Sequence, residues 1–160
     1  KMEKLLKIPY TVFNNDWDLL QKFLERRGNP RYELVGNIDL RFRDDIIDLG
    51  NLIRVDGFMN LEDSSIESLG SLEYVSGYLY LYSTPIESLG NLLRIDNSLD
   101  IRGTTFETLG NLKYIGNNLY MQSAELQSFG DLEYVGGKII LTTNHQIPEE
   151  QLNKFKFRYW

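Results

Sequence analysis

The chain has 160 residues, of which 42% are hydrophobic, a formal net charge of -6 and no cysteine. This length and hydrophobic content predict one globular domain with a continuous core that needs no metal or disulfide. The acidic balance argues against direct binding of nucleic acid, because such binding depends on Lys and Arg at the phosphates. The lack of cysteine excludes thiolate metal sites and Cys nucleophiles, and it fits a reducing compartment.

Residues 1–30 predict a helical cap at the start of the domain. The opening sequence KMEKLLKIPY has an apolar run too short and interrupted for a signal peptide, and no 18-residue apolar stretch follows. We therefore expect a soluble, cytoplasmic protein without membrane contact. Asn15 and Asp16 then precede WDLLQKFLERRG, in which Gly28 ends the helix. One face of this helix is apolar: Trp17, Leu20, Phe23 and Leu24.

Residues 31–147 consist of a repeat of twenty residues. From Leu49 the rows read LGNLIRVDGFMNLEDSSIES, LGSLEYVSGYLYLYSTPIES, LGNLLRIDNSLDIRGTTFET, LGNLKYIGNNLYMQSAELQS and FGDLEYVGGKIILTTNHQIP, after an incomplete earlier row. Such periodicity is typical of a solenoid, in which each coil buries its apolar side chains against its neighbours. The sequence thus predicts a mainly β solenoid of about six coils.

Each row divides into positions that recur and positions that vary. The second position is always glycine, which favours a turn with positive φ: Gly50, Gly70, Gly90, Gly110 and Gly130. The fourth, seventh, eleventh and thirteenth positions are apolar in every row, the eighteenth is apolar in the first four rows, and the eleventh and thirteenth form an L-x-L strand in each coil. These apolar positions are the predicted core.

The phrases LYLYSTPI and LDIRGTTF resemble the leucine-rich-repeat consensus, L-x-L-x-x-N-x-L. The preceding V-x-G segment also resembles the short leucine-rich β-helices of growth-factor and insulin receptors. The asparagine position here holds Ser64, Thr84, Thr104 and Ala124, so Ser and Thr hydroxyls are expected to bond the backbone in its place. The resemblance implies a parallel sheet whose concave face binds ligands.

The outward positions of the L-x-L strands are the predicted binding surface. Equivalent positions form columns, since strands in neighbouring coils lie about 4.8 Å apart. Tyr78, Tyr80 and Tyr82 alternate with leucines and would form an aromatic ridge in the middle of this surface. Tyr and Arg are enriched at binding hot spots, although tyrosine also suits an exposed strand for structural reasons. The remaining candidate residues are Arg41, Asn60, Glu62, Asp100, Arg102 and Tyr120.

Two further columns have structural interpretations. The sixth position alternates Arg54, Tyr74, Arg94, Tyr114 and Tyr134, a pattern that predicts a ladder of guanidinium groups stacked on rings. The line of Glu67, Glu87 and Glu107 predicts a solvated edge, with an acidic docking strip as the alternative.

Residues 148–160 predict a C-terminal cap. Pro148 and the two acids after it favour the start of a helix. Four aromatic residues then supply apolar cover for the last coil: Phe155, Phe157, Tyr159 and Trp160.

The sequence carries no catalytic, metal-binding or cofactor motif. His145 is the one histidine and is interpreted as a turn residue, and no nucleophile elbow or phosphate-binding glycine loop occurs. We expect no enzyme but a protein-interaction module of bacterial or viral origin that presents its concave sheet to another protein. A carbohydrate-binding solenoid, an acidic decoy for a nucleic-acid-binding protein and self-association through an end coil are the alternatives.

Overall fold

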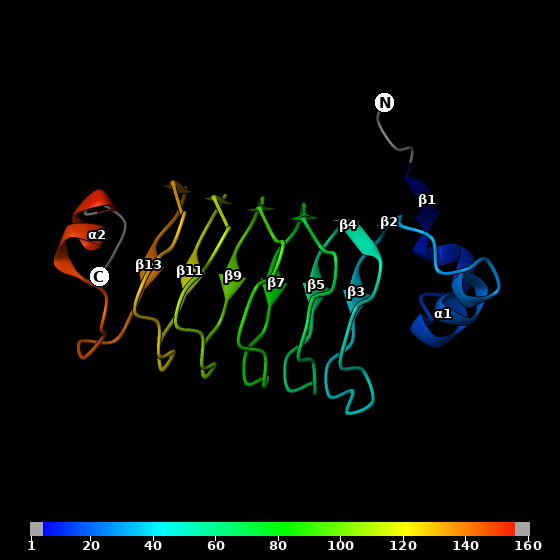
Figure 1. Cartoon of the computed structure of the whole chain (residues 1–160), viewed down its shortest axis with the longest axis horizontal. Coiled ribbons are helices and arrows are strands. Elements are labelled where there is room, and N and C mark those ends of the chain that lie inside the picture. The colour runs from blue at the N-terminus through cyan, green and yellow to red at the C-terminus, as the bar shows by residue number, and fades with distance from the viewer. Residues whose placement is uncertain (1–4, 156–160) are drawn as a thin grey trace.

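The computed structural model describes residues 5–155, which form a parallel β-solenoid of about five turns. Figure 1 shows the coils stacked in one row, with a helix at each end of the row. The predicted β solenoid is therefore confirmed.

The N-terminal cap contains more than the predicted helix. It begins with the strand β1 (Leu6–Pro9) and the 3-10 turn η1 (Tyr10–Phe13), which precede the helix α1 (Trp17–Glu25). The side chain of Asp16 accepts a hydrogen bond from the backbone N–H of Leu19 and so caps α1, as the sequence predicts. The helix buries its apolar face against the first coil: Trp17, Leu20 and Leu24, with Phe23 partly buried.

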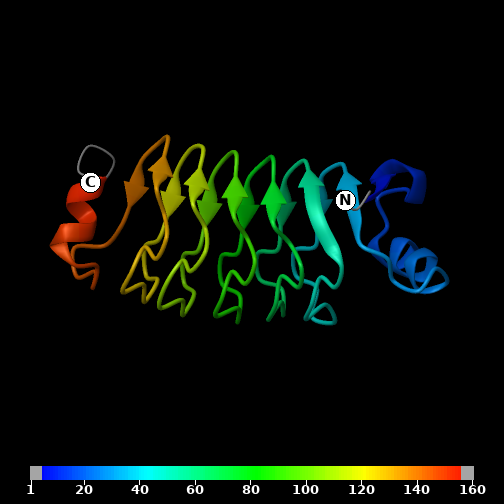
Figure 2. The same cartoon turned by 45° about the horizontal axis from the view of Figure 1, so that its top comes forward.

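The coils carry two parallel sheets, whereas the sequence predicts one strand per coil. Sheet A contains β1, β2 (Tyr32–Val35), β4 (Leu52–Asp56), β6 (Tyr74–Val75), β8 (Arg94–Ile95), β10 (Tyr114–Ile115) and β12 (Tyr134–Val135). Sheet B contains β3 (Ile38–Asp39), β5 (Met59–Asn60), β7 (Leu79–Tyr80), β9 (Leu99–Asp100), β11 (Leu119–Tyr120) and β13 (Ile139–Ile140). Figure 2 shows the strands running across the row of coils, with those of the two sheets pointing in opposite directions. The predicted L-x-L strands are sheet B, and the V-x-G phrase is the corner between the sheets.

The core consists of the predicted apolar positions. Leucine, isoleucine, valine, phenylalanine and methionine side chains of every coil stack in the interior, and most are fully buried. The first position of each row, which the sequence analysis did not assign to the core, is also buried: Leu49, Leu69, Leu89, Leu109 and Phe129.

A polar turn recurs before each coil. The residue two places before the repeated glycine accepts a hydrogen bond from the glycine N–H, at 2.5–3.0 Å, in all five rows. The five acceptors are Asp48, Ser68, Ser88, Thr108 and Ser128. The glycines have φ between +57° and +63°, which confirms the predicted positive φ.

Hydroxyl groups take part in the backbone hydrogen bonding at the asparagine position of the repeat. Thr84 Oγ1 donates to the carbonyl oxygen of Leu81 at 2.8 Å, and Thr104 Oγ1 donates in the same way to Ile101. Ser64 Oγ instead accepts from the N–H of Ile66 at 3.4 Å. The predicted substitution of hydroxyls for asparagine is confirmed at these three positions.

The helix α2 (Glu149–Lys154) covers the last coil. Gln151 Oε1 accepts a hydrogen bond from Phe129 N at 2.8 Å, and Phe155 packs edge-on against the Phe129 ring at 5.4 Å. The predicted capping residues Phe157, Tyr159 and Trp160 lie outside the described residues. Among residues 5–155, no helix is long and apolar enough to span a membrane.

Two glycines test the stacking of the coils. A Cβ at Gly116 would overlap the carbonyl oxygen of Asp96 in the preceding coil, whereas a Cβ at Gly110 would meet no atom within 4 Å. We expect Gly116→Ala to lower the free energy of unfolding by at least about 2 kcal/mol, because the coils would have to separate. Gly110→Ala should cost about 1 kcal/mol through its φ of +58° alone. Urea denaturation measures both, and equal losses would contradict this stacking.

Candidate functional site: the outer face of sheet B

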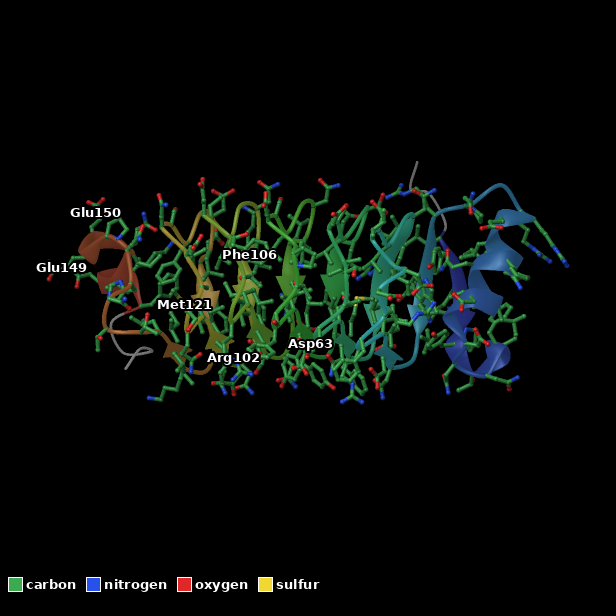
Figure 3. All side chains as sticks on the ribbon, turned by 90° about the horizontal axis from the view of Figure 1, so that it is seen from below. Asp63, Arg102, Phe106, Met121, Glu149 and Glu150 are labelled. Atoms are coloured by element: carbon green, nitrogen blue, oxygen red, sulfur yellow. The ribbon has the colours of Figure 1, made fainter. Side chains whose placement is uncertain are left out.

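All nine predicted binding residues occupy outward positions of the coils on one side of the solenoid, which we call the sheet B face, although Asn60 and Asp100 are buried there. It consists of the outward side chains of the tenth, twelfth and fourteenth positions of the coils. Strand register places Tyr80 beside Asp100, and Asp100 beside Tyr120. Arg102 lies at the outer surface of the solenoid, whereas Phe106 of the same coil lies inside it (Figure 3).

An aromatic cluster occupies the N-terminal half of this face. The Tyr78 ring stacks on Phe58 at a centroid distance of 4.6 Å and on Tyr80 at 3.9 Å. Phe58 extends the predicted ridge by one coil. Tyr78 and Tyr80 are half-buried, and this burial raises the pKa of both hydroxyls, so both stay neutral at physiological pH. The stacked rings of Phe58, Tyr78 and Tyr80 therefore form a rigid, mainly apolar patch on the sheet B face.

Tyr82 stands apart from this cluster. Its ring is 40% exposed, and its ring contact is with the Arg102 guanidinium, whose central carbon lies 4.9 Å from the ring centroid. The guanidinium also lies 5.7 Å from the Tyr120 ring. Arg102 therefore links two tyrosines of different coils through cation–π contacts.

Asp100 is buried beneath this arrangement, although it was predicted as a surface anchor. Only 1% of the residue is exposed, because its short side chain lies between the larger Tyr80 and Tyr120. Its carboxylate accepts hydrogen bonds from the Arg102 backbone N–H at 3.0 Å, from Nε at 3.0 Å and from Nη2 at 2.7 Å. The buried Asp100 carboxylate thus holds the Arg102 guanidinium in place and does not itself face solvent.

The same D-x-R pattern occurs at the N-terminal end of the face with a different result. Asp39 accepts from Arg41 Nε at 2.9 Å and Nη2 at 2.8 Å, but both side chains are almost half exposed. This hydrogen bonding lowers the pKa of Asp39. Asp39 belongs to the edge strand β3, and its neighbour in the adjacent coil is the small Asn60, so this ion pair stays exposed to water.

Asn60 and Glu62 connect these two pairs. Asn60 is only 8% exposed, and its Oδ1 accepts the backbone N–H of Glu62 at 3.0 Å. Burial, together with the nearby charge of Asp100, raises the pKa of Glu62. Asn60 therefore supports the turn, while Glu62 adds a carboxylate held in a partly desolvated position.

No role was predicted for Gln122, which follows Arg102 in the fourteenth-position column. Its Oε1 is buried and has no hydrogen-bond partner among the described residues. Its neighbour Tyr120 is oriented by a hydrogen bond of 2.9 Å from Asn118 Nδ2 to the tyrosine oxygen. The C-terminal half of the face is thus more polar than the aromatic half.

Sheet A carries the predicted ladder of arginine and tyrosine. The guanidinium of Arg94 lies 3.8 Å from the Tyr114 ring centroid, that of Arg54 lies 5.0 Å from Tyr74, and Tyr114 stacks on Tyr134 at 4.6 Å. This confirms the stacking. The column of Glu67, Glu87 and Glu107 is exposed.

The described residues do not assemble a metal centre. No group of three or more His, Asp or Glu side chains between residues 5 and 155 is placed to hold a metal ion. His145 Nδ1 accepts the backbone N–H of Ile147 at 3.2 Å, which is a local turn interaction.

Comparison of the chain with family models, curated proteins and solved structures gave no match. The resemblance to leucine-rich repeats therefore stays a prediction.

The two D-x-R pairs give a direct test of Asp100 burial. Arg102→Ala would leave the Asp100 carboxylate buried without its cation, so we expect a loss of about 1–3 kcal/mol of unfolding free energy. Arg41→Ala removes an exposed pair and should cost less than about 0.5 kcal/mol. Chemical denaturation of both variants at pH 7 checks this, and similar losses would show that Asp100 is accessible to water.

A second test uses the raised pKa of Glu62. The folded chain holds this proton more tightly than the unfolded chain, so its contribution to stability is lost as pH rises from about the ordinary value of 4.5 through the folded pKa. Glu62→Gln does not lose a proton. We expect the variant to be more stable than the wild type at pH 7, with the gain shrinking as pH falls toward 4. A gain that is independent of pH in urea titrations would disprove the shift.

Proposed function

We propose that this chain is a non-catalytic interaction module that binds another protein through the sheet B face. The observation that carries the proposal is the rigid group at the centre of that face: Phe58, Tyr78 and Tyr80 stacked together, with Arg102 held by the buried Asp100. Aromatic residues and arginine dominate protein-binding hot spots.

The stacked rings and Arg102 are held in place before any partner binds, which lowers the entropy cost of association. Immobilising a flexible side chain on association costs about 0.5–1.5 kcal/mol. The tyrosine rings are already fixed by stacking, and Arg102 is fixed by hydrogen bonds from three of its nitrogens to one carboxylate. A partner would therefore meet side chains that lose little freedom when they are covered.

The distribution of variation along the repeat agrees with a recognition surface. Interior positions repeat from coil to coil, whereas the twelfth position runs through Asp39, Asn60, Tyr80, Asp100, Tyr120 and Ile140. Stacking of coils requires the interior pattern but imposes no such diversity outside. The diverse columns are therefore free to match one particular partner.

Carbohydrate binding is less well supported as an alternative. Sugar rings bind by stacking on an open aromatic face, but Tyr78 lies between Phe58 and Tyr80, which cover both faces of its ring. The decoy hypothesis needs a continuous acidic surface, and Arg41 and Arg102 interrupt the acids on sheet B. Self-association through an end coil is a separate hypothesis that sedimentation of the purified chain would test.

The test compares two matched pairs of tyrosines on opposite sheets. Tyr80→Ala with Tyr82→Ala removes rings from the sheet B face, and Tyr114→Ala with Tyr134→Ala removes one half-buried and one exposed ring from sheet A. Arg102 is kept, since its loss would destabilise the fold. Each protein is immobilised, and proteins are captured from a lysate of the organism that produces the chain.

We expect the wild type and the sheet A variant to retain the same protein, and the sheet B variant to retain at least tenfold less of it. Melting curves must first show that both variants are folded. Equal retention by all three proteins, or loss in the sheet A variant alone, would contradict binding at the sheet B face.

A further inference from the structure

Glu62 is a carboxylate on the sheet B face without a cation of its own. Among residues 5–155, its side chain has neither a hydrogen bond nor an ion pair. The two arginines nearby are already engaged. Arg41 pairs with Asp39 at 2.8 Å, and Arg102 pairs with the buried Asp100 at 2.7 Å. Each local guanidinium therefore belongs to an aspartate, and Glu62 is left unmatched.

The charges around Glu62 are mainly negative. Four charged residues act on its carboxylate: Asp100, Arg102, Arg41 and Asp63. Together with Asp39, which pairs with Arg41, these residues and Glu62 carry four negative charges against two positive charges. Figure 3 shows Asp63 and Arg102 on the same side of the solenoid. Burial, and after it the charge of Asp100, raises the pKa of Glu62, so a cation that reached this carboxylate would be favoured.

An accessible tyrosine ring lies next to this carboxylate. Glu62 and Tyr82 occupy the same outward position in neighbouring coils, and the Asp63 N–H bonds the Tyr82 carbonyl at this point. Arg102, in the following coil, lies over one face of the Tyr82 ring at 4.9 Å. The opposite face is therefore turned toward the coil of Glu62, and Tyr82 is 40% exposed. A cation bound to Glu62 can thus also contact an aromatic ring.

The aromatic patch of Phe58, Tyr78 and Tyr80 borders the same carboxylate. Burial is the main cause of the raised pKa of both tyrosine hydroxyls, and the charge of Glu62 also acts on both. The patch and the carboxylate therefore form one surface with an apolar part and an acidic part. Lysine and arginine side chains match this combination, because each carries its charge at the end of a long apolar stem.

We propose that the protein partner of the sheet B face places a lysine or arginine side chain here, with its cation paired to Glu62 and its stem on the aromatic patch. The cation also contacts the Tyr82 ring. The same arrangement exists within the chain, since Arg102 pairs with Asp100 and lies against the ring of Tyr82. This inference rests on the proposed function of the sheet B face, and it adds the chemistry of the partner: a basic residue within its binding surface.

A displayed library of random octapeptides tests this directly. Peptides are selected on the wild-type chain after removal of those that bind the Tyr80→Ala, Tyr82→Ala variant, so the selection itself does not involve Glu62. The survivors are synthesised with a fluorescent label, and their dissociation constants for wild type, Glu62→Gln and Glu67→Gln are measured by polarisation. Glu62→Gln is expected to fold, because it removes a partly buried charge. Glu67→Gln is the matched control, since it loses the same charge at an exposed position outside the sheet B face.

We expect the survivors to be enriched in lysine or arginine, to bind Glu62→Gln about tenfold more weakly, and to bind Glu67→Gln within about twofold of wild type. Replacing the basic residue of a peptide by glutamine should cost about tenfold on the wild type and little on Glu62→Gln, because the two groups belong to one contact.

The proposal is overturned if no peptide survives, if the survivors lack basic residues, or if Glu62→Gln weakens binding no more than Glu67→Gln does. Survivors that bind without Glu62 would still depend on the tyrosines of the sheet B face, so the proposed function would stand. Failure of the proposed function is read separately, in the lysate capture, as equal retention by the wild type and the sheet B variant.

Discussion

Backbone hydrogen bonds between successive coils hold residues twenty positions apart side by side, and every surface feature of this chain depends on that registration. In sheet B, the Leu79 N–H bonds the Ser98 carbonyl and the Leu99 N–H bonds the Asn118 carbonyl, each at 2.9 Å. The stacked apolar interior keeps this register, because a shift would misalign the buried side chains of every coil. The outward residues are thereby aligned in columns by the backbone, whether or not their own side chains contact one another.

This constraint explains why similar local sequences behave differently. Asp39 with Arg41 and Asp100 with Arg102 form the same local pair, yet only Asp100 is buried, because its neighbours in the adjacent coils are tyrosines. The environment of a residue on this solenoid is set more by the coils on either side than by its own strand.

The repeat predicted the fold, the buried columns and the positive-φ glycines, since each follows from a residue type recurring at a fixed spacing. The α1 cap was predicted instead from Asp16 and from the apolar face of the helix that follows it. Sheet A was not predicted because its recurring apolar positions, the fourth and seventh of each row, lie three residues apart and do not show the alternation of the L-x-L strands. The polar turn acceptors Asp48, Ser68, Ser88, Thr108 and Ser128 also recur, and that signal was available. The burial of Asp100 depends on side-chain size across coils, and the shift of register between β2 and β4 is a local irregularity; periodicity alone encodes neither.

The central claim is that a partner covers sheet B and leaves the outer face of sheet A open at its C-terminal end. Tyr82 and Tyr134 allow a direct measurement, because they are 40% and 44% exposed and lie on opposite sheets. Nitration of exposed tyrosines, read by mass spectrometry with and without the captured partner, reports which ring is covered. The account predicts that the partner protects Tyr82 and leaves Tyr134 reactive. Protection of Tyr134 with Tyr82 still reactive would contradict it.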